Sequence, residues 1–174
     1  MKRATLQLGV SCWLLAVACW PWVARAQQFH LERHTDILSV LCLGDDRWML
    51  RYPVYQFQTG DVDGDGSVDA LVGVVKTTRY DSVCARRLFI FKGKRGKVRP
   101  LWMGSRLGGR LEDFRFVDGR VRSLEYGREG HYAVAEYEWQ GFGLGFVRYL
   151  LREATADEAR RRFESDDIDT DTNY

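Results

Sequence analysis

The chain has 174 residues, of which 45% are hydrophobic and 29% charged, with 26 Lys and Arg against 24 Asp and Glu. This is an ordinary globular composition, and it excludes a disordered chain, a collagen-like chain and a membrane protein with many spans. The length indicates one domain that can bury a substantial core.

The first 26 residues have the layout of a secretory signal peptide. Lys2 and Arg3 form a basic start, residues 6–23 are apolar and uncharged, and Ala24-Arg25-Ala26 matches an A-x-A cleavage signal. Two alternatives stay open. One is an uncleaved membrane anchor, because the apolar stretch is near the lower limit for a span; the other is lipidation at Cys19, where the sequence loosely resembles a bacterial lipobox. We expect a secreted or periplasmic protein or, alternatively, a membrane-anchored lipoprotein.

The predicted leader holds three basic residues and no acidic one, so the mature chain carries 23 basic against 24 acidic residues. Because this charge is nearly balanced, we expect no nucleic-acid partner for an exported chain. Two cysteines, Cys42 and Cys84, remain after cleavage. An even pair in an exported protein predicts one disulfide, and the alternative is two buried free thiols.

Most of the mature chain has the pattern of short strands. β-branched and aromatic residues recur at about every second position, and turn residues separate the runs. Asp118-Gly119, for example, is typical of a two-residue hairpin turn because both positions tolerate positive φ. The predicted strands lie near residues 37–43, 47–57, 70–77, 87–91, 98–103, 111–117, 121–126, 132–139 and 145–151. We expect a mainly β fold, an antiparallel meander with an open sheet or a small barrel, similar to propeller blades.

Helical signals are confined to the C-terminal end. Thr155 precedes a run of good helix formers and Glu158 follows three residues later, which is the spacing of a capping box. This predicts a short helix within residues 153–164 and a disordered acidic tail over residues 165–174. The β domain is expected to span residues 27–152.

The strongest chemical signal is the segment Asp61-Val62-Asp63-Gly64-Asp65-Gly66-Ser67-Val68-Asp69. Alternate acidic residues in a tight loop direct several carboxylates to one centre, where they would repel one another without a cation. Ca²⁺ prefers roughly six to eight oxygen ligands. We therefore expect a calcium site, and the alternative is a solvated acidic turn. The expected ligands are Asp61, Asp63, Asp65, the backbone carbonyl of Ser67, and Asp69.

This segment is not an EF-hand loop. Val72 stands where that loop needs a bidentate Glu, and strand-like residues flank the segment on both sides. Residues 60–73 resemble instead the calcium loop of FG-GAP and VCBS repeats, which consists of a strand, a Gly-Asp-x-Asp-x-Asp-Gly-x-x-Asp segment and an apolar strand ending in Gly. The resemblance implies Ca²⁺ ligation by the same five residues. Such repeats normally form the blades of a closed propeller, whereas this chain has one loop and strands for about two blades.

A second candidate surface extends from Arg86 to Arg99, a segment with seven basic residues and no acidic one. Its charge predicts a patch for an anionic glycan, a lipid phosphate or an acidic protein. The alternative is a hairpin whose charged tip keeps the sheet soluble. The seven residues are Arg86, Arg87, Lys92, Lys94, Arg95, Lys97 and Arg99.

Two further sets of residues carry weaker signals. Glu136 and Glu138 lie two positions apart on a predicted strand, which is typical of a half-exposed face. The three histidines, His30, His34 and His131, match no recognisable hydrolase motif.

Three classes of function stay open. The first is an exported, non-enzymatic binding module of FG-GAP or VCBS type, stabilised by Ca²⁺, with a protein or glycan partner outside the cytoplasm. The second is a small periplasmic inhibitor or envelope-maintenance protein that contacts its target through the basic hairpin. The third is a metal-dependent hydrolase that uses the acidic loop. Membrane contact is expected only through a lipidated Cys19 or an uncleaved signal.

Overall fold

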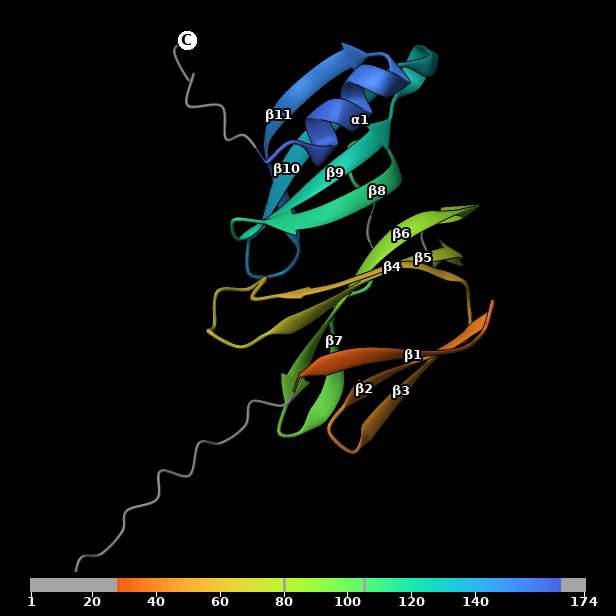
Figure 1. Ribbon diagram of the computed structural model, residues 1–174, viewed down its shortest axis with the longest axis vertical. Coiled ribbons are helices and arrows are strands. Elements are labelled where there is room, and N and C mark those ends of the chain that lie inside the picture. The colour runs from red at the N-terminus through yellow and green to blue at the C-terminus, as the bar shows by residue number, and fades with distance from the viewer. Residues whose placement is uncertain (1–27, 80, 105, 167–174) are drawn as a thin grey trace, which may run out of the picture.

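The computed structural model describes residues 28–79, 81–104 and 106–166 (Figure 1). The predicted leader and residues 167–174 of the predicted tail lie outside this part of the chain. The elements in chain order are β1 (Phe29–Thr35), β2 (Leu38–Leu43), β3 (Asp46–Leu50), β4 (Val54–Gly60), β5 (Asp69–Thr78), β6 (Asp81–Lys94), β7 (Lys97–Trp102), β8 (Arg110–Val117), β9 (Arg120–Tyr126), a short 3₁₀ turn (Arg128–Gly130), β10 (Tyr132–Trp139), β11 (Leu144–Ala154) and α1 (Ala156–Glu164).

The strands form three antiparallel sheets. Sheet A has the order β1-β2-β3, sheet B the order β4-β5-β6-β7, and sheet C the order β11-β10-β9-β8. The predicted mainly β meander with a short C-terminal helix is confirmed, and the sheets of the described chain do not close into a barrel.

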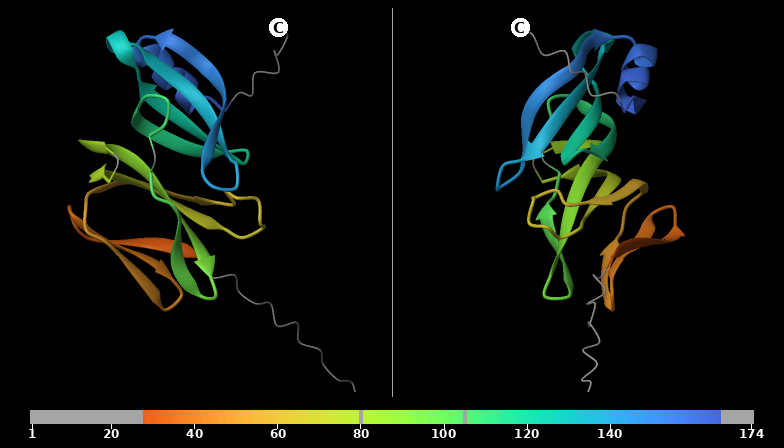
Figure 2. Two further views of the ribbon diagram at one scale, coloured as in Figure 1. Left: turned by 180° about the vertical axis from the view of Figure 1, so that it is seen from behind. Right: turned by 60° about the vertical axis from the view of Figure 1, so that its left-hand side comes forward.

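Sheet B is the central layer, with sheet A on one side and sheet C on the other (Figures 1 and 2). Along β5, Val72 and Val74 belong to the core shared with sheet A, whereas Leu71 belongs to the core shared with sheet C. All residues from Asp69 to Val74 are buried. A strand covered on both faces needs a continuous apolar run, and this explains the sequence of β5.

The helix α1 covers the outer face of sheet C (Figure 2), where Ala159 and Phe163 are buried. The predicted capping box is present: the Thr155 hydroxyl accepts from the Glu158 backbone, and the Glu158 carboxylate accepts from the Thr155 backbone. Arg115 of β8 donates to the Phe163 carbonyl at 3.1 Å and so caps the other end of the helix. Among the described residues, no helix has the length and apolar character that crossing a membrane requires.

The predicted single strand over residues 47–57 is wrong. The chain leaves sheet A after Leu50 and enters sheet B at Val54, and Pro53, which has no N–H to donate to a strand ladder, lies in the connection. Strand β1 is an element that the sequence pattern did not predict. Its apolar alternation is short, because only Phe29 and Leu31 in this strand pack on the core.

The predicted disulfide between Cys42 and Cys84 is also wrong, since both cysteines are free. Cys42 is buried in β2 of sheet A, whereas Cys84 is exposed near the beginning of β6 in sheet B. The two residues therefore belong to different sheets and have different environments, and the alternative of two buried thiols holds only for Cys42.

Candidate metal centre

The acidic segment forms the turn that joins β4 to β5 at one end of sheet B (Figure 1). The strand ladder closes at the pair Gly60 and Asp69, so residues 61–68 make up the turn itself. Gly64 (φ +72°) and Gly66 (φ +83°) have left-handed backbone conformations, which residues with a side chain rarely adopt. The two glycines let the chain reverse direction within a few residues and bring the aspartates together.

Three carboxylates converge in this turn. Asp61, Asp63 and Asp65 each offer an oxygen, and these oxygens lie within 4.8 Å of one another. Backbone N–H groups hold two of them in place, because Gly66 donates to Asp61 Oδ2 at 2.9 Å and Ser67 donates to Asp65 Oδ1 at 2.8 Å. The other oxygen of Asp61 is buried and has no hydrogen-bond partner among the described residues. The turn is therefore built around oxygen donors whose bonding is incomplete.

Asp69 lies at the base of the turn and is fully buried. Its Oδ2 accepts the backbone N–H of Val62 at 3.1 Å, but its Oδ1 has no hydrogen-bond partner in the part of the chain that the structure describes. Burial, and to a smaller extent the nearby charge of Asp63, raises the pKa of Asp69 to about 6. An unpaired oxygen on a buried carboxyl group is unfavourable, and a cation is the partner that would remove this cost.

Lys92 of β6 supplies positive charge next to the turn. Its Nζ lies 2.5 Å from Asp63 Oδ2 and 2.8 Å from Asp65 Oδ2. These hydrogen bonds raise the pKa of Lys92, and the same contact lowers the pKa of Asp65. One residue that the sequence assigned to partner binding thus neutralises part of the acidic turn.

The structure brings together only some of the predicted calcium ligands. Asp61, Asp63 and Asp65 form one group, and Asp69 is not within 4.8 Å of all three, although it shares the same turn. Ser67 is exposed, and its backbone N–H bonds to Asp65.

The seven predicted basic residues do not form one surface. Five of them gather around the hairpin that joins β6 to β7, where they line a groove together with Pro100. The strand register places Lys92 opposite Arg99 and Lys94 opposite Lys97. Lys97 also pairs with Asp46 of sheet A at 3.0 Å. The five residues are Lys92, Lys94, Arg95, Lys97 and Arg99.

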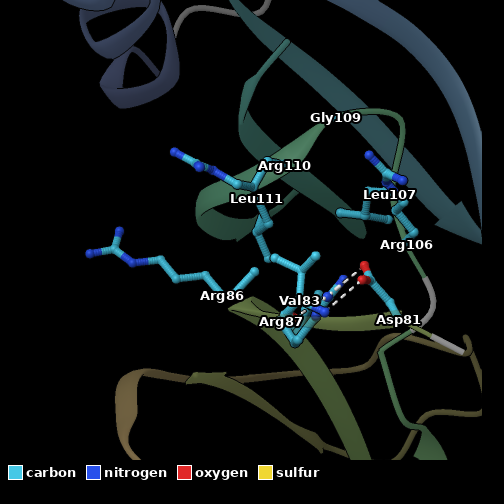
Figure 3. Close-up of a pocket in the computed structure, with 11 residues that line it drawn as sticks. Asp81, Val83, Arg86, Arg87, Arg106, Leu107, Gly109, Arg110 and Leu111 are labelled. Atoms are coloured by element: carbon cyan, nitrogen blue, oxygen red, sulfur yellow. Dashed lines mark hydrogen bonds and ion pairs between the residues drawn. The ribbon is translucent and has the colours of Figure 1, made fainter. Parts of the chain in front are cut away.

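Arg86 and Arg87 lie elsewhere on β6, beside a small pocket of about 110 Å³ below β8 (Figure 3). Arg87 is buried and donates to Asp81 at 2.7 Å, and this contact lowers the pKa of Asp81. The guanidinium of Arg86 lies over the Tyr55 ring, 4.7 Å from its centre, and also donates to the Glu112 carbonyl. Both arginines make contacts within the fold and lie apart from the groove that the other five basic residues line, so the seven residues do not form one patch; partner binding by Arg86 and Arg87 stays a prediction.

A group of three residues that could hold a metal ion, which the sequence did not predict, lies on sheet A. His30, Glu32 and Cys42 each offer an atom within 4.8 Å of the others. The signal in the sequence is His30-Leu31-Glu32-Arg33-His34, in which donor residues occupy every second position, as on one face of a strand. Cys42 joins them only through the pairing of β1 with β2.

Comparison of the chain with protein-family models, with curated proteins and with solved structures gives no match. We infer its function from the geometry of its residues.

Proposed function

We propose that the protein is an exported, non-enzymatic binding module whose β4–β5 turn holds one structural Ca²⁺. The observation that carries this proposal is a pair of buried carboxylate oxygens, one of Asp61 and one of Asp69, for which the described residues offer no hydrogen-bond partner, in a turn that also gathers Asp63 and Asp65. All the donors are oxygen atoms, which suits a hard cation. The resemblance of residues 60–73 to the calcium loop of FG-GAP and VCBS repeats supports the choice of Ca²⁺, and the leader-like residues 1–26 support export.

A cation in this turn would act on the contact between sheets B and C. Val62 of the turn packs in the core that the two sheets share. Just before the turn, the side chain of Gln58 accepts the backbone N–H of Phe116 in β8 at 2.7 Å. A Cβ on Gly60 would collide with the Phe116 ring, so the two chain segments approach closely at this point. Fixing the turn therefore stabilises the sheet packing, and binding free energy becomes folding free energy.

The proposal is tested by titrating Ca²⁺ into chelator-treated mature protein by calorimetry and by comparing thermal unfolding in Ca²⁺ and in EGTA. We expect one site, and at a calcium concentration a hundredfold above Kd the protein should gain about 2.7 kcal/mol of stability. Asp63→Asn should weaken binding by tenfold or more. Asp118→Asn, in the exposed β8–β9 turn, is the matched control and should bind normally. Identical melting in both buffers without a heat of binding would contradict the proposal.

One observation favours the second candidate function, a small periplasmic inhibitor or envelope-maintenance protein. The β6–β7 hairpin presents Lys94, Arg95 and Arg99 as exposed cations around a groove. Such a surface complements an acidic protein or an anionic glycan. Retention on a sulfated-glycan column should fall in the double variant Lys94→Glu/Arg99→Glu. The double variant Arg51→Glu/Arg152→Glu makes the same change of charge at exposed positions elsewhere, and it should elute later than the hairpin variant.

A further inference from the structure

The face of sheet A that points away from sheet B carries nitrogen, oxygen and sulfur donors together. His30 and Glu32 occupy alternate positions of β1, so their side chains leave the same face of the strand. Cys42 lies directly opposite His30 in the β1–β2 register. The intervening residues Leu31 and Leu41 pack into the core between sheets A and B. The donor cluster therefore lies on the opposite, outer face of the sheet.

Glu32 is the centre of this cluster. Its Oε1 lies 3.3 Å from His30 Nε2 and its Oε2 lies 3.8 Å from His34 Nε2. The Cys42 Sγ atom lies within 4.8 Å of the donor atoms of both His30 and Glu32. Ligand atoms about 2.0–2.3 Å from a tetrahedral zinc ion lie about 3.3–3.6 Å from one another. The separation of His30 and Glu32 matches this spacing, and Cys42 Sγ lies within 4.8 Å of both donors, so a small adjustment of the side chains would place all three around one metal ion.

The donor atoms of the cluster on sheet A differ chemically from those of the acidic turn. A thiolate and imidazoles are the ligands that Zn²⁺ and similar transition metals prefer, whereas Ca²⁺ prefers oxygen alone. One thiolate and one carboxylate balance a divalent charge in formal terms, because an imidazole ligand is neutral. Cys42 is fully buried, and its thiol makes a weak hydrogen bond to the Val40 carbonyl at 3.7 Å.

One cation lies close to the cluster and would oppose metal binding. Arg47 of β3 is directly opposite Cys42 in the β2–β3 register. Its guanidinium donates to the carbonyls of Gly44 and Asp46, at 2.7 and 3.2 Å, at the β2–β3 turn. The positive charge is therefore held by the turn and does not pair with Glu32 in the described contacts.

From this geometry we propose that sheet A binds one Zn²⁺, or a transition metal of similar preference, through His30, Glu32 and Cys42. His34 Nε2 lies 3.8 Å from Glu32 Oε2 but outside this group of three, and it is the nearest histidine that a side-chain movement would add as a fourth ligand. The ion would link β1 to β2, and because β1 is an edge strand with a short apolar pattern, it would fix the N-terminal strand to the fold. This site is independent of the calcium turn, which lies in sheet B.

The test loads chelator-treated, reduced mature protein with Co²⁺, which reports thiolate ligation by a sulfur-to-metal charge-transfer absorption band, and then displaces it with Zn²⁺. We expect one equivalent of Co²⁺ and a thiolate band. The Zn²⁺ affinity is measured by competition with a chromogenic chelator. Cys42→Ser should abolish the band, and His30→Ala should weaken Zn²⁺ binding by at least tenfold.

Matched controls exist for each residue type. Cys84→Ser and His131→Ala change an exposed thiol and an exposed imidazole outside the cluster, and both should leave the band and the affinity unchanged. Asp63→Asn should impair Ca²⁺ binding and leave Zn²⁺ binding intact, so failure of one site is distinguishable from failure of the other. Because Cys42 is buried, its variant has to be checked for folding; the exposed His30 carries the test if that variant unfolds. Absence of the band in the unaltered protein, or unchanged affinity in His30→Ala, would overturn the proposal.

Discussion

The ammonium group of Lys92 lies 2.5 Å from the Oδ2 atom of Asp63, and so connects strand β6 to the β4–β5 turn. It also bonds to Asp65 at 2.8 Å. Lys92 therefore places a positive charge against the acidic turn and balances part of the negative charge of the turn. A bound Ca²⁺ would use the same two carboxylates, so Lys92 and the proposed metal compete for them.

Replacing Lys92 by Met is expected to raise the affinity for Ca²⁺ about tenfold, since metal binding then has no ammonium group to displace. Tenfold corresponds to about 1.4 kcal/mol, close to the contribution of a hydrogen bond to a charged group. In EGTA the variant should melt at a lower temperature, because its carboxylates have lost their counter-ion. Titration calorimetry and thermal unfolding measure the two effects.

Lys94→Met is the matched control, because Lys94 is exposed two positions further along β6 and should affect neither quantity. A weaker affinity in Lys92→Met would show that Lys92 shapes the turn for the metal and does not compete with it.

The strand pattern was predictable where turns are explicit. Asp118 (φ +51°) and Gly119 (φ +76°) form the left-handed turn that their sequence indicates, and β8 and β9 follow as expected. The pattern failed at residues 47–57, because apolar residues continue across the point where the chain changes sheets. The stacking of three sheets was not predictable, since a period of two tells which face of a strand is buried but not which sheet covers it.

The candidate sites can likewise be divided into one that the sequence predicts and one that it does not. The acidic turn was predictable because its donors are contiguous in sequence. His30 and Cys42 become neighbours only through the β1–β2 register, and β1 itself was missed. Glu136 was expected on a half-exposed face but is 5% exposed, because arginines from neighbouring strands surround it. Its partner Glu138 in that prediction is exposed.

Glu136 of β10 forms ion pairs with Arg122 of β9 at 3.2 Å and with Arg148 of β11 at 2.9 Å. Glu136→Gln should lower the free energy of unfolding by about 3 kcal/mol, because it leaves a buried guanidinium without its counter-charge. Urea denaturation at neutral pH measures this change. Glu138→Gln, on the same strand but exposed, should stay within about 0.5 kcal/mol of the unaltered protein. An equal loss in the free energy of unfolding for the two variants would contradict the stabilising role given to the ion pairs of Glu136.

The same cluster predicts a dependence on pH. Burial acts to raise the pKa of Glu136, but hydrogen bonds from Arg148 and Arg122 outweigh it and hold the pKa below its ordinary value of 4.5. The unfolded state therefore binds the proton more readily, and stability is lost as the pH falls from about 4.5 through the lower folded-state pKa. The difference in free energy of unfolding between the unaltered protein and Glu136→Gln should shrink between about pH 7 and about pH 3. A constant difference over this range would argue against the assignment.

Tyr137 ties β10 to the connection between β7 and β8. Its hydroxyl donates to the buried carboxylate of Glu125 at 2.8 Å and accepts the N–H of Gly108 at 3.0 Å. Tyr137→Phe removes both hydrogen bonds and should lower the free energy of unfolding by about 1–2 kcal/mol. Urea denaturation measures this change. Tyr132→Phe is the control, since Tyr132 packs against Tyr126 as a ring and its hydroxyl makes no hydrogen bond in the described structure. A similar loss in both variants would show that the effect comes from something other than these hydrogen bonds.

Thr155 caps the N-terminal end of α1, the helix that covers sheet C. Replacing Thr155 tests whether the packing of α1 on sheet C depends on this cap. Thr155→Ala deletes the hydroxyl that accepts the Glu158 N–H and should cost about 1 kcal/mol. Because Phe163 at the other end of α1 is buried in the core below the helix, fraying should also raise hydrogen exchange in α1 and in the strands beneath it. Thr155→Ser keeps the hydroxyl and should restore most of the stability. If exchange rises only in the first turn of α1, the helix is held by its packed face and by the Arg115 cap rather than by Thr155.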